Sequence, residues 1–274
     1  MELYTSTSYQ LARTLTLNYS TSFGQSSKLF SKDIRDHIYA IYGLVRVADE
    51  IVDTYTGKNT AQLLHELETH TLEALKTGFS PNPLVHAFAT TARQFDIQPN
   101  LITPFFKSMA MDLEVRTYTQ AEYETYIYGS AEVIGLMCLK VFCNDKNQYK
   151  KLEAGARALG SAYQKVNFLR DIAADYDERG RVYFPSVEFD SFNDAQKETI
   201  IADIKVDFKK ASVAVPKLPT NARSAVTLSF EYYSELLHKL ENASAESIKA
   251  GRLRVGTAKK LQLFAKSRFK IGAA

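Results

Sequence analysis

The stretch IYAIYGLVRVADEIVD, residues 38–53, is apolar over most of a helical circumference yet contains two acidic residues four positions apart. At alternating steps of three and four, one helical stripe contains Tyr39, Tyr42, Arg46, Asp49 and Asp53. Two exposed carboxylates at this spacing repel by only about 0.2–0.5 kcal/mol, whereas burying unpaired charges costs several kcal/mol each. The stripe therefore requires either open solvent or bound cations.

A second segment, YQKVNFLRDIAADYDERGRVYFP (163–185), repeats the pattern. Steps of three, four and four place four oxygen-bearing residues on one face, namely Gln164, Asn167, Asp171 and Asp175, and Arg170 and Arg181 flank them. Oxygen ligands without imidazole or thiolate suit Mg²⁺ or Mn²⁺, and Mg²⁺ usually completes its shell with water and substrate phosphate. We therefore predict that the two stripes face each other across a cavity and bind Mg²⁺ and a diphosphate, with the arginines on phosphate oxygens.

Helical spacing of apolar residues continues through almost the whole chain of 274 residues, and strand-like alternation is rare. We predict helices near residues 4–19, 31–55, 60–76, 83–95, 100–116, 120–142, 147–175, 194–214, 220–243 and 257–268. Gly and Pro interrupt the pattern near residues 77–83, 96–100, 177–181 and 215–219. None of these breaks resembles an interdomain linker, so the sequence predicts a single all-α domain over residues 1–274.

Aromatic residues are abundant, with 16 Tyr, 16 Phe and no Trp. Two further predicted helices would present mixed faces to a cavity, one with Phe105, Ser108 and Asp112, the other with Tyr126, Ser130, Ile134 and Met137. An aromatic and aliphatic pocket beneath a metal–diphosphate site suits a long hydrocarbon chain, and its ring faces would stabilise a carbocation. Each of these residues, taken singly, fits ordinary core packing as well.

The formal charge of +3 is unevenly distributed. Residues 247–274 contain eight Lys or Arg and no acidic residue, which leaves 26 basic against 31 acidic residues in the remainder. This basic tail is compatible with a solvated terminal helix, with an anionic substrate, or with peripheral association at an anionic membrane face. We expect no nucleic-acid partner.

The sequence also bears on location. The first residues, MELYTSTSYQ, do not resemble a secretory signal, and no window approaches the roughly 18 apolar residues of a membrane span. Cys138 and Cys143 fall on different faces of one predicted helix, so we expect them not to pair, as suits a reducing cytoplasm. The five histidines show no metal-ligand spacing. We expect a cytoplasmic protein, with peripheral association at the inner membrane face as the open alternative.

The chain resembles the squalene/phytoene synthase family, and most closely its bacterial phytoene synthases. Five segments carry the likeness: YSTSF (19–23), residues 38–53, MDLEVRTYT (111–119), YIYGSAEVIGLM (126–137) and residues 163–185. The pair D-x-x-x-D and N-x-x-x-D-x-x-x-D, with R-V-Y-F-P after it, is specific to this family. Head-to-tail prenyl synthases usually carry D-D-x-x-D, and here position 50 is Glu. The resemblance implies an all-α prenyl-synthase fold with a central cavity.

The resemblance also implies roles by position. Mg²⁺ would be held by Asp49, Asp53, Asn167, Asp171 and Asp175. Diphosphate would be contacted by Tyr42, Arg46, Gln164 and Arg170, and covered by Tyr19, Ser20 and Ser22. Phe23 and Tyr126 would line the reacting centre, and Tyr183 would add a substrate contact beyond the second motif. Of these residues, the expected participants in catalysis are Tyr42, Arg46, Asp49, Asp53, Tyr126, Asp171 and Asp175.

The implied reaction joins two allylic prenyl diphosphates head to head through a cyclopropylcarbinyl diphosphate. We expect a Mg²⁺-dependent phytoene synthase that uses two C20 geranylgeranyl diphosphates, with no NADPH. A C15 enzyme making squalene, dehydrosqualene or a hydroxylated relative is the alternative, and a non-catalytic assembly protein is a third.

The chain departs from the family pattern at one place. Many relatives carry an aromatic residue before the RLRV-like segment, and here residues 241–251, ENASAESIKAG, contain none. The sequence indicates no oligomeric state.

Overall fold

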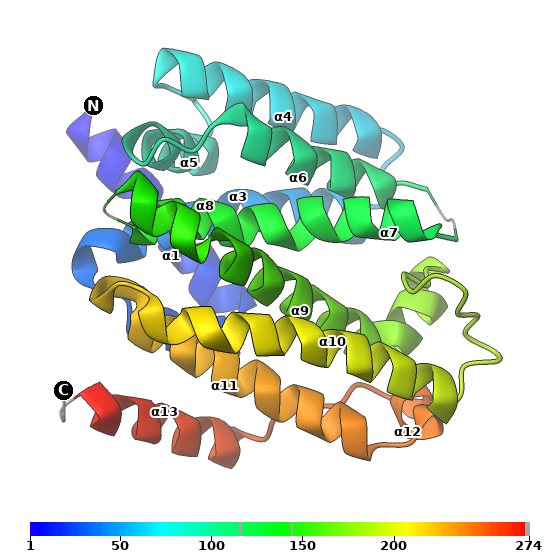
Figure 1. Ribbon diagram of the computed structural model, residues 1–274. Helices are drawn as coiled ribbons and strands as arrows, with labels where there is room; N and C mark the ends of the chain where they lie inside the picture. The colour runs from blue at the N-terminus through cyan, green and yellow to red at the C-terminus, as the bar shows by residue number, and fades with distance from the viewer. Residues whose placement is uncertain (115–116, 144, 272–274) are drawn as a thin grey trace.

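The computed structural model describes residues 1–114, 117–143 and 145–271 and shows a bundle of helices (Figure 1). In chain order the helices are α1 (Glu2–Tyr19), α2 (Thr21–Ser27), α3 (Lys32–Asp49), α4 (Thr60–Thr77), α5 (Pro83–Gln94), α6 (Pro99–Met111), α7 (Gln120–Ile127), α8 (Val133–Phe142), α9 (Lys146–Arg179), α10 (Asp194–Ala214), α11 (Thr220–Asn242), α12 (Ala245–Ala250) and α13 (Thr257–Ile271). Within this part of the chain there is no strand, only an isolated bridge between Thr117 and Val182. The prediction of an all-α fold is confirmed.

Several boundaries differ from the prediction. The helix expected over residues 31–55 ends as α3 and continues as a π-helical turn, η1 (Glu50–Thr54), and the helix expected over 120–142 is interrupted by a second π-turn, η2 (Tyr128–Glu132). Both π-turns carry or border residues predicted for the site, as is common for such bulges. The short helices α2 and α12 were not predicted, because each has too few residues to show a period, although each begins after a serine N-cap.

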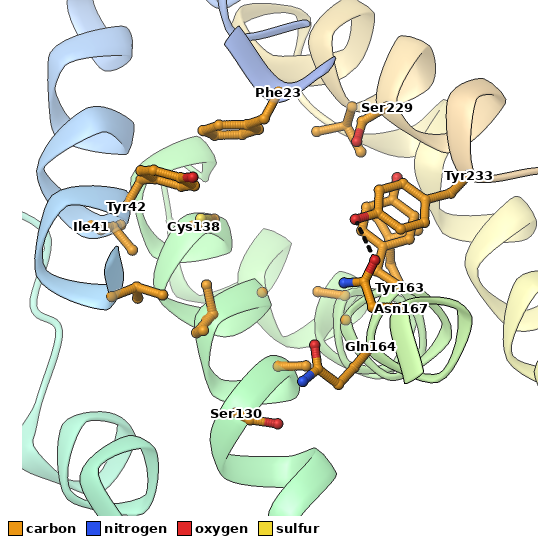
Figure 2. A pocket seen from close by; sticks show the side chains of 18 of the residues that line it. Phe23, Ile41, Tyr42, Ser130, Cys138, Tyr163, Gln164, Asn167, Ser229 and Tyr233 are labelled. Atoms are coloured by element: carbon orange, nitrogen blue, oxygen red, sulfur yellow. Dashed lines mark hydrogen bonds between the residues drawn. The ribbon is translucent and has the colours of Figure 1, made fainter. Parts of the chain in front are cut away.

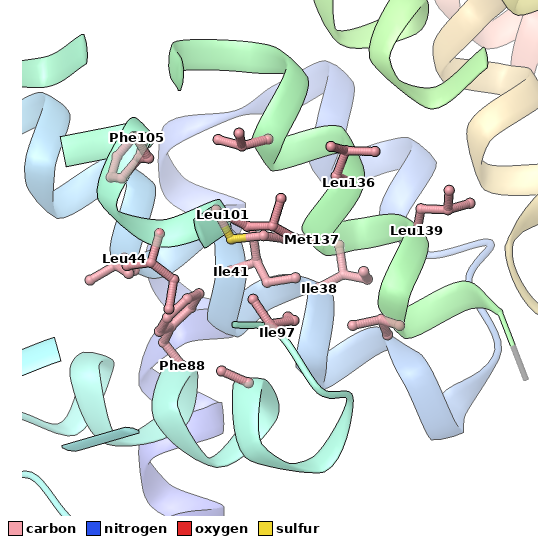
Figure 3. Packing of buried hydrophobic residues seen from close by; sticks show 14 of the residues in the cluster. Ile38, Ile41, Leu44, Phe88, Ile97, Leu101, Phe105, Leu136, Met137 and Leu139 are labelled. Carbon is pink, nitrogen blue, oxygen red and sulfur yellow. The ribbon is translucent and has the colours of Figure 1, made fainter. Parts of the chain in front are cut away.

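The apolar core forms where α3, α5, α6 and α8 pack together (Figure 3). Ile38, Ile41 and Leu44 of α3 meet Phe88 of α5 there, and all four are almost fully buried. Phe105 and Met137, which the sequence placed at a cavity, lie in this core instead. A second cluster surrounds the distal half of α9 and contains aromatic side chains from α7 and the 183–192 segment. α3 therefore packs in the first cluster, and the distal half of α9 packs in the second.

Gly129 allows the π-turn η2 to approach α6. A Cβ at this position would lie 2.1 Å from both the Pro104 carbonyl oxygen and the Ser108 Oγ. We expect Gly129→Ala to lower the free energy of unfolding by about 1–3 kcal/mol, the usual cost of overpacking. Gly251→Ala is the control, since nothing lies within 4 Å of its Cβ. Equal melting temperatures for the two variants would contradict this packing.

Among the described residues, one segment, Gln120–Phe142, is long and apolar enough to cross a membrane by length and composition. The sequence expectation that no window approaches such a span is therefore too strict. In the bundle, 61% of that window is buried against other helices. Such burial is typical of a core helix, which can be as long and as apolar as a membrane span.

Candidate active site

A cavity of about 590 Å³ lies inside the bundle, bordered by α2, α3, α8, α9 and α11. Figure 2 shows Phe23 and Tyr42 on one side of it, and Tyr163, Asn167 and Tyr233 on the opposite side. One end is polar, and the other is closed by apolar residues that include Phe30, Phe142, Leu152, Leu218 and Val226. Small residues also border the cavity, among them Gly135, Gly155, Ala214 and Ala225. The shape combines a charged opening with a deep apolar end.

The stripe on α3 faces this cavity as predicted for four of its five members, because Tyr42, Arg46, Asp49 and Asp53 all border it. Tyr39 instead is buried and accepts a hydrogen bond from the hydroxyl of Ser27 at 3.3 Å. The guanidinium of Arg46 forms ion pairs with Glu50 and, at 3.9 Å, with Asp49. Glu50 therefore serves as a partner of Arg46 and does not border the cavity.

The stripe on α9 faces the same space from the other side, with Gln164, Asn167, Asp171 and Asp175. Arg170 Nε donates to Asp171 Oδ1 at 2.8 Å. Tyr233 of α11 donates its hydroxyl to Asn167 Oδ1 at 3.3 Å (Figure 2). The structure thus brings together the two oxygen-rich stripes that the sequence predicted.

Two arginines near the end of α9 connect the stripes. Arg179 Nη1 donates to Asp175 Oδ1 at 3.1 Å, and its Nε lies 3.5 Å from Asp53 Oδ1. Arg181 Nη1 donates to the same Asp53 oxygen at 2.9 Å. Arg179 was not singled out from the sequence, although it continues the stripe four residues after Asp175. It was missed because the sequence predicted a helix break at residues 177–181. In the structure α9 continues to Arg179 and ends at Gly180, whose backbone is in the left-handed conformation.

Two carboxyl groups at the polar end of the cavity, those of Asp49 and Asp175, have raised pKa values. Burial, followed by the charge of Asp53, raises the pKa of Asp49 to about 7, and burial, followed by the charge of Asp171, raises the pKa of Asp175 to about 7. Asp49 keeps 33% of its side-chain surface, yet that surface faces the cavity. Clustered carboxylates in a cavity with limited water hold protons more strongly unless cations neutralise them. Bound cations would therefore stabilise the ionised carboxylates at the polar end of the cavity.

The donor set fits Mg²⁺. Within the described residues, no group of three or more His, Cys, Asp or Glu side chains lies close enough together to hold a metal ion. Mg²⁺ does not need one, because it usually binds through one or two carboxylates and fills its shell with water and substrate phosphates. Asp49 and Asp53 on one wall and Asn167, Asp171 and Asp175 on the other would offer such partial sets.

The raised pKa values predict how stability changes with pH. The folded protein keeps protons on Asp49 and Asp175 up to about pH 7, whereas an ordinary Asp carboxyl loses its proton near 3.8. Since the folded state binds more protons across that window, the free energy of unfolding falls as the pH rises through it. We expect the metal-free melting temperature to fall less steeply between about pH 5 and about pH 8 in Asp175→Asn than in the native protein.

Asp177→Asn is the control, since Asp177 is an exposed residue on α9 outside the cavity. It should keep the native pH dependence. An identical pH dependence in Asp175→Asn would contradict the burial of that carboxyl.

Part of the basic tail closes over the acidic residues. Arg252 Nε lies 2.8 Å from Asp171 Oδ1, and its Nη2 donates to Oδ2 at 3.1 Å. Burial, followed by the charges of Arg254 and Arg170, lowers the pKa of Lys260. Cations of this segment therefore gather at the opening of the cavity, which favours the anionic-substrate interpretation for them. The side chains of Arg268 and Lys270 lie outside the described residues, as do Val115 and Arg116 of the 111–119 segment.

The segment expected to cover a diphosphate forms α2 and its N-cap. Ser20, Ser22 and Phe23 border the cavity, and Ser20 Oγ accepts a hydrogen bond from the Phe23 amide at 3.2 Å. Tyr19 does not border the cavity. It is 49% exposed at the edge, where the Arg46 guanidinium lies 4.4 Å from its ring centre. Stacking of Phe23 on Tyr42, with ring centres 5.2 Å apart, joins α2 to α3.

Deeper in the cavity the side chains are aromatic or small. Tyr126 and Tyr183 border it as predicted, and the Ser130 hydroxyl beside them is buried without a hydrogen-bond partner. Two rings missed from the sequence, Tyr163 and Tyr233, stack with centres 3.8 Å apart on the α9–α11 wall. They are spaced 70 positions apart, so no local period joins them. They provide aromatic surface in the cavity despite its absence from residues 241–251.

The family described as Squalene/phytoene synthase matches residues 16–259. The chain belongs to the squalene/phytoene synthase family. It is 34% identical to a phytoene synthase of Arthrospira platensis over 203 residues, which cover 69% of this chain and 64% of that protein. A 15-cis-phytoene synthase of Synechocystis sp. is 28% identical over 281 residues, which cover 92% and 82% of the two chains.

Solved structures show the same fold. A dehydrosqualene synthase in complex with ligand superimposes with a TM-score of 0.78, at 20% identity and 98% coverage of both chains. Squalene synthase HpnC from Alicyclobacillus acidocaldarius gives a TM-score of 0.75 at 17% identity, covering 92% of this chain and 97% of that one. The chain therefore has the all-α isoprenoid synthase fold of this family. The match spans just under two thirds of the Arthrospira protein.

Proposed function

We propose that this protein is a phytoene synthase, which condenses two molecules of geranylgeranyl diphosphate into phytoene and releases two diphosphates. The observation that carries the proposal is the pair of acidic stripes, on α3 and α9, facing each other across one deep apolar cavity. The sequence likeness to the phytoene synthases of Arthrospira platensis and Synechocystis sp. supports the C20 substrate. This would make the reaction the committed step of carotenoid synthesis.

The polar end of the cavity would bind the diphosphate groups. Asp49, Asp53, Asn167, Asp171 and Asp175 would hold Mg²⁺, which supplies charge neutralisation for a departing diphosphate. Arginine side chains would add bidentate contacts to phosphate oxygens, since Arg46, Arg170 and Arg252 already lie among these carboxylates. Their present carboxylate partners hold them in position until a substrate arrives.

The apolar end would bind the two prenyl chains and exclude water. An allylic cation formed on loss of diphosphate would lie among the rings of Phe23, Tyr42 and Tyr126, whose faces stabilise positive charge. The double bond of the second substrate would attack that cation. Exclusion of water is essential here, because water would capture the cation before the second chain could react.

The second candidate is a C15 enzyme that uses farnesyl diphosphate. Two observations favour it, the fold shared with a dehydrosqualene synthase and 25% identity to a 4,4'-diapophytoene synthase of Staphylococcus haemolyticus over 190 residues. The longer and closer matches to phytoene synthases outweigh these observations. A purely structural role in assembly is disfavoured because neither acidic stripe has lost its carboxylates.

A product assay tests the proposal. Purified protein with Mg²⁺ would receive C15 and C20 allylic diphosphates separately, each with and without NADPH, and hydrocarbons would be identified by mass. We expect a C40 product from the C20 substrate without NADPH. A C30 product alone would move the assignment to the second candidate, and no hydrocarbon from either substrate would contradict both.

A further inference from the structure

A buried carboxylate, Asp112, borders the cavity and is not part of the proposed metal and diphosphate site. It is the C-cap residue of α6, and only 4% of its side-chain surface is exposed. Its Oδ2 accepts a hydrogen bond from the Tyr126 hydroxyl at 2.6 Å, and its Oδ1 accepts one from the Tyr183 hydroxyl at 3.0 Å. Both tyrosines border the cavity.

Asp112 is held in place by a third partner. Arg181 donates to its backbone carbonyl oxygen and lies 3.9 Å from Oδ1, while the same guanidinium binds Asp53 at 2.9 Å. The Tyr126 ring packs against Tyr118, Phe168 and Tyr183, with centres 5.0–5.7 Å away. The phenol therefore has a fixed orientation, and Asp112 is its hydrogen-bond acceptor at the polar end of the cavity.

The proposed reaction needs a proton acceptor at that end. When the first cation closes a cyclopropane ring, the carbon that carried diphosphate bonds to two carbons of the second substrate and must lose one hydrogen as a proton. Burial raises the pKa of Tyr126 well above 10, so its hydroxyl keeps its proton and is a weak base alone. A phenol can accept a proton only if it passes its own to a partner.

We propose that Asp112 is the positioning residue and proton acceptor for Tyr126 during ring closure. The C–H bond breaks and its electrons form the new C–C bond, the substrate proton goes to the Tyr126 oxygen, and the phenolic proton moves to Asp112 Oδ2. The diphosphate released in the same half-reaction then takes the proton from Asp112. This inference rests on the proposed head-to-head condensation and assigns one of its proton transfers.

The test uses the full-length protein, Mg²⁺ and whichever allylic diphosphate, C20 or C15, the native protein converts. We expect Asp112→Asn and Tyr126→Phe each to lower turnover by about 10²-fold or more, with binding of a non-reactive substrate analogue retained. The double variant should be no slower than the slower single variant, because the two residues act as one unit. Substrate deuterated at the diphosphate-bearing carbon should show a larger kinetic isotope effect in Asp112→Asn than in the native protein.

Asp207→Asn is the matched control. Asp207 is also buried and accepts hydrogen bonds from Ser161 and Lys165, but it lies outside the cavity. It should lower the melting temperature and leave the isotope effect unchanged. Additive losses in the double variant, or a native isotope effect in Asp112→Asn, would overturn the inference while the hydrocarbon product still supports the proposed function. Absence of product from the native protein would overturn both.

Discussion

Asp49→Asn and Asp171→Asn should each lower the rate of hydrocarbon formation by about 10³-fold, and the double variant should form no measurable product. A carboxylate that helps to hold Mg²⁺ against a departing diphosphate supplies about 4 kcal/mol of transition-state stabilisation, and each 1.36 kcal/mol corresponds to a factor of ten. Both side chains border the same cavity from opposite walls, on α3 and α9. Rates would be measured at saturating Mg²⁺ and C20 diphosphate.

The control variant is Asp177→Asn, which removes an exposed carboxylate of α9 outside the cavity. Its rate should stay within about twofold of the native rate, since surface substitutions away from special contacts have small effects. A second measurement separates folding from metal binding. Mg²⁺ with inorganic diphosphate should raise the melting temperature of the native protein and of Asp177→Asn, and leave that of the double variant unchanged. An equal rise in the melting temperature of all three proteins would contradict a metal site at these carboxylates.

Arg181→Met should destabilise the protein by about 3 kcal/mol at neutral pH, because it leaves the buried Asp112 carboxylate without its nearest cation. The Arg181 side chain is 8% exposed and contacts Asp53, Asp112 and the Val52 carbonyl. For a chain of this length the loss corresponds to a fall in melting temperature of roughly 6–12 °C. Circular dichroism at 222 nm during heating would measure it.

The pH dependence makes this prediction more specific. Burial already raises the pKa of Asp112 to about 6, against the lowering effect of Arg181. Without Arg181 that pKa rises further, so the folded state binds more protons and the destabilisation grows as the pH rises. The loss should be smaller near pH 5 than near pH 8. Arg223→Met, which removes an exposed arginine bonded to a backbone carbonyl, should cost about 1 kcal/mol or less at either pH.

The fold and the two acidic stripes could be predicted because their information is local. Apolar spacing identified the long helices, and steps of three and four placed Asp49 with Asp53 and Asp171 with Asp175. The π-turns at η1 and η2 could not be predicted, since each has only five residues and is too short to show a period of its own. Short helices such as α2 have too few residues for a period to appear.

Contacts between distant segments explain what the sequence did not reveal. Arg252 reaches Asp171 across 81 positions, and Tyr126 reaches Asp112 from a different helix. Neither pair shares a helical face, so only packing brings the side chains together. Arg179 is a different case. It lies on the stripe that contains Asp175. The predicted helix ended at residue 175, and a prediction that extended the helix to Gly180 would have placed Arg179 on that stripe.

The most direct test is to locate the metal in a crystal of the native protein grown with Mn²⁺ and a thio-analogue of the C20 diphosphate that does not ionise. We predict anomalous scattering peaks between the carboxylates of Asp49 on α3 and Asp53 on η1 and those of Asp171 and Asp175 on α9, with the diphosphate between the walls and the prenyl chain in the apolar end. Mn²⁺ bound elsewhere, or an analogue bound in the cavity with no metal at these carboxylates, would contradict the proposed metal–diphosphate site.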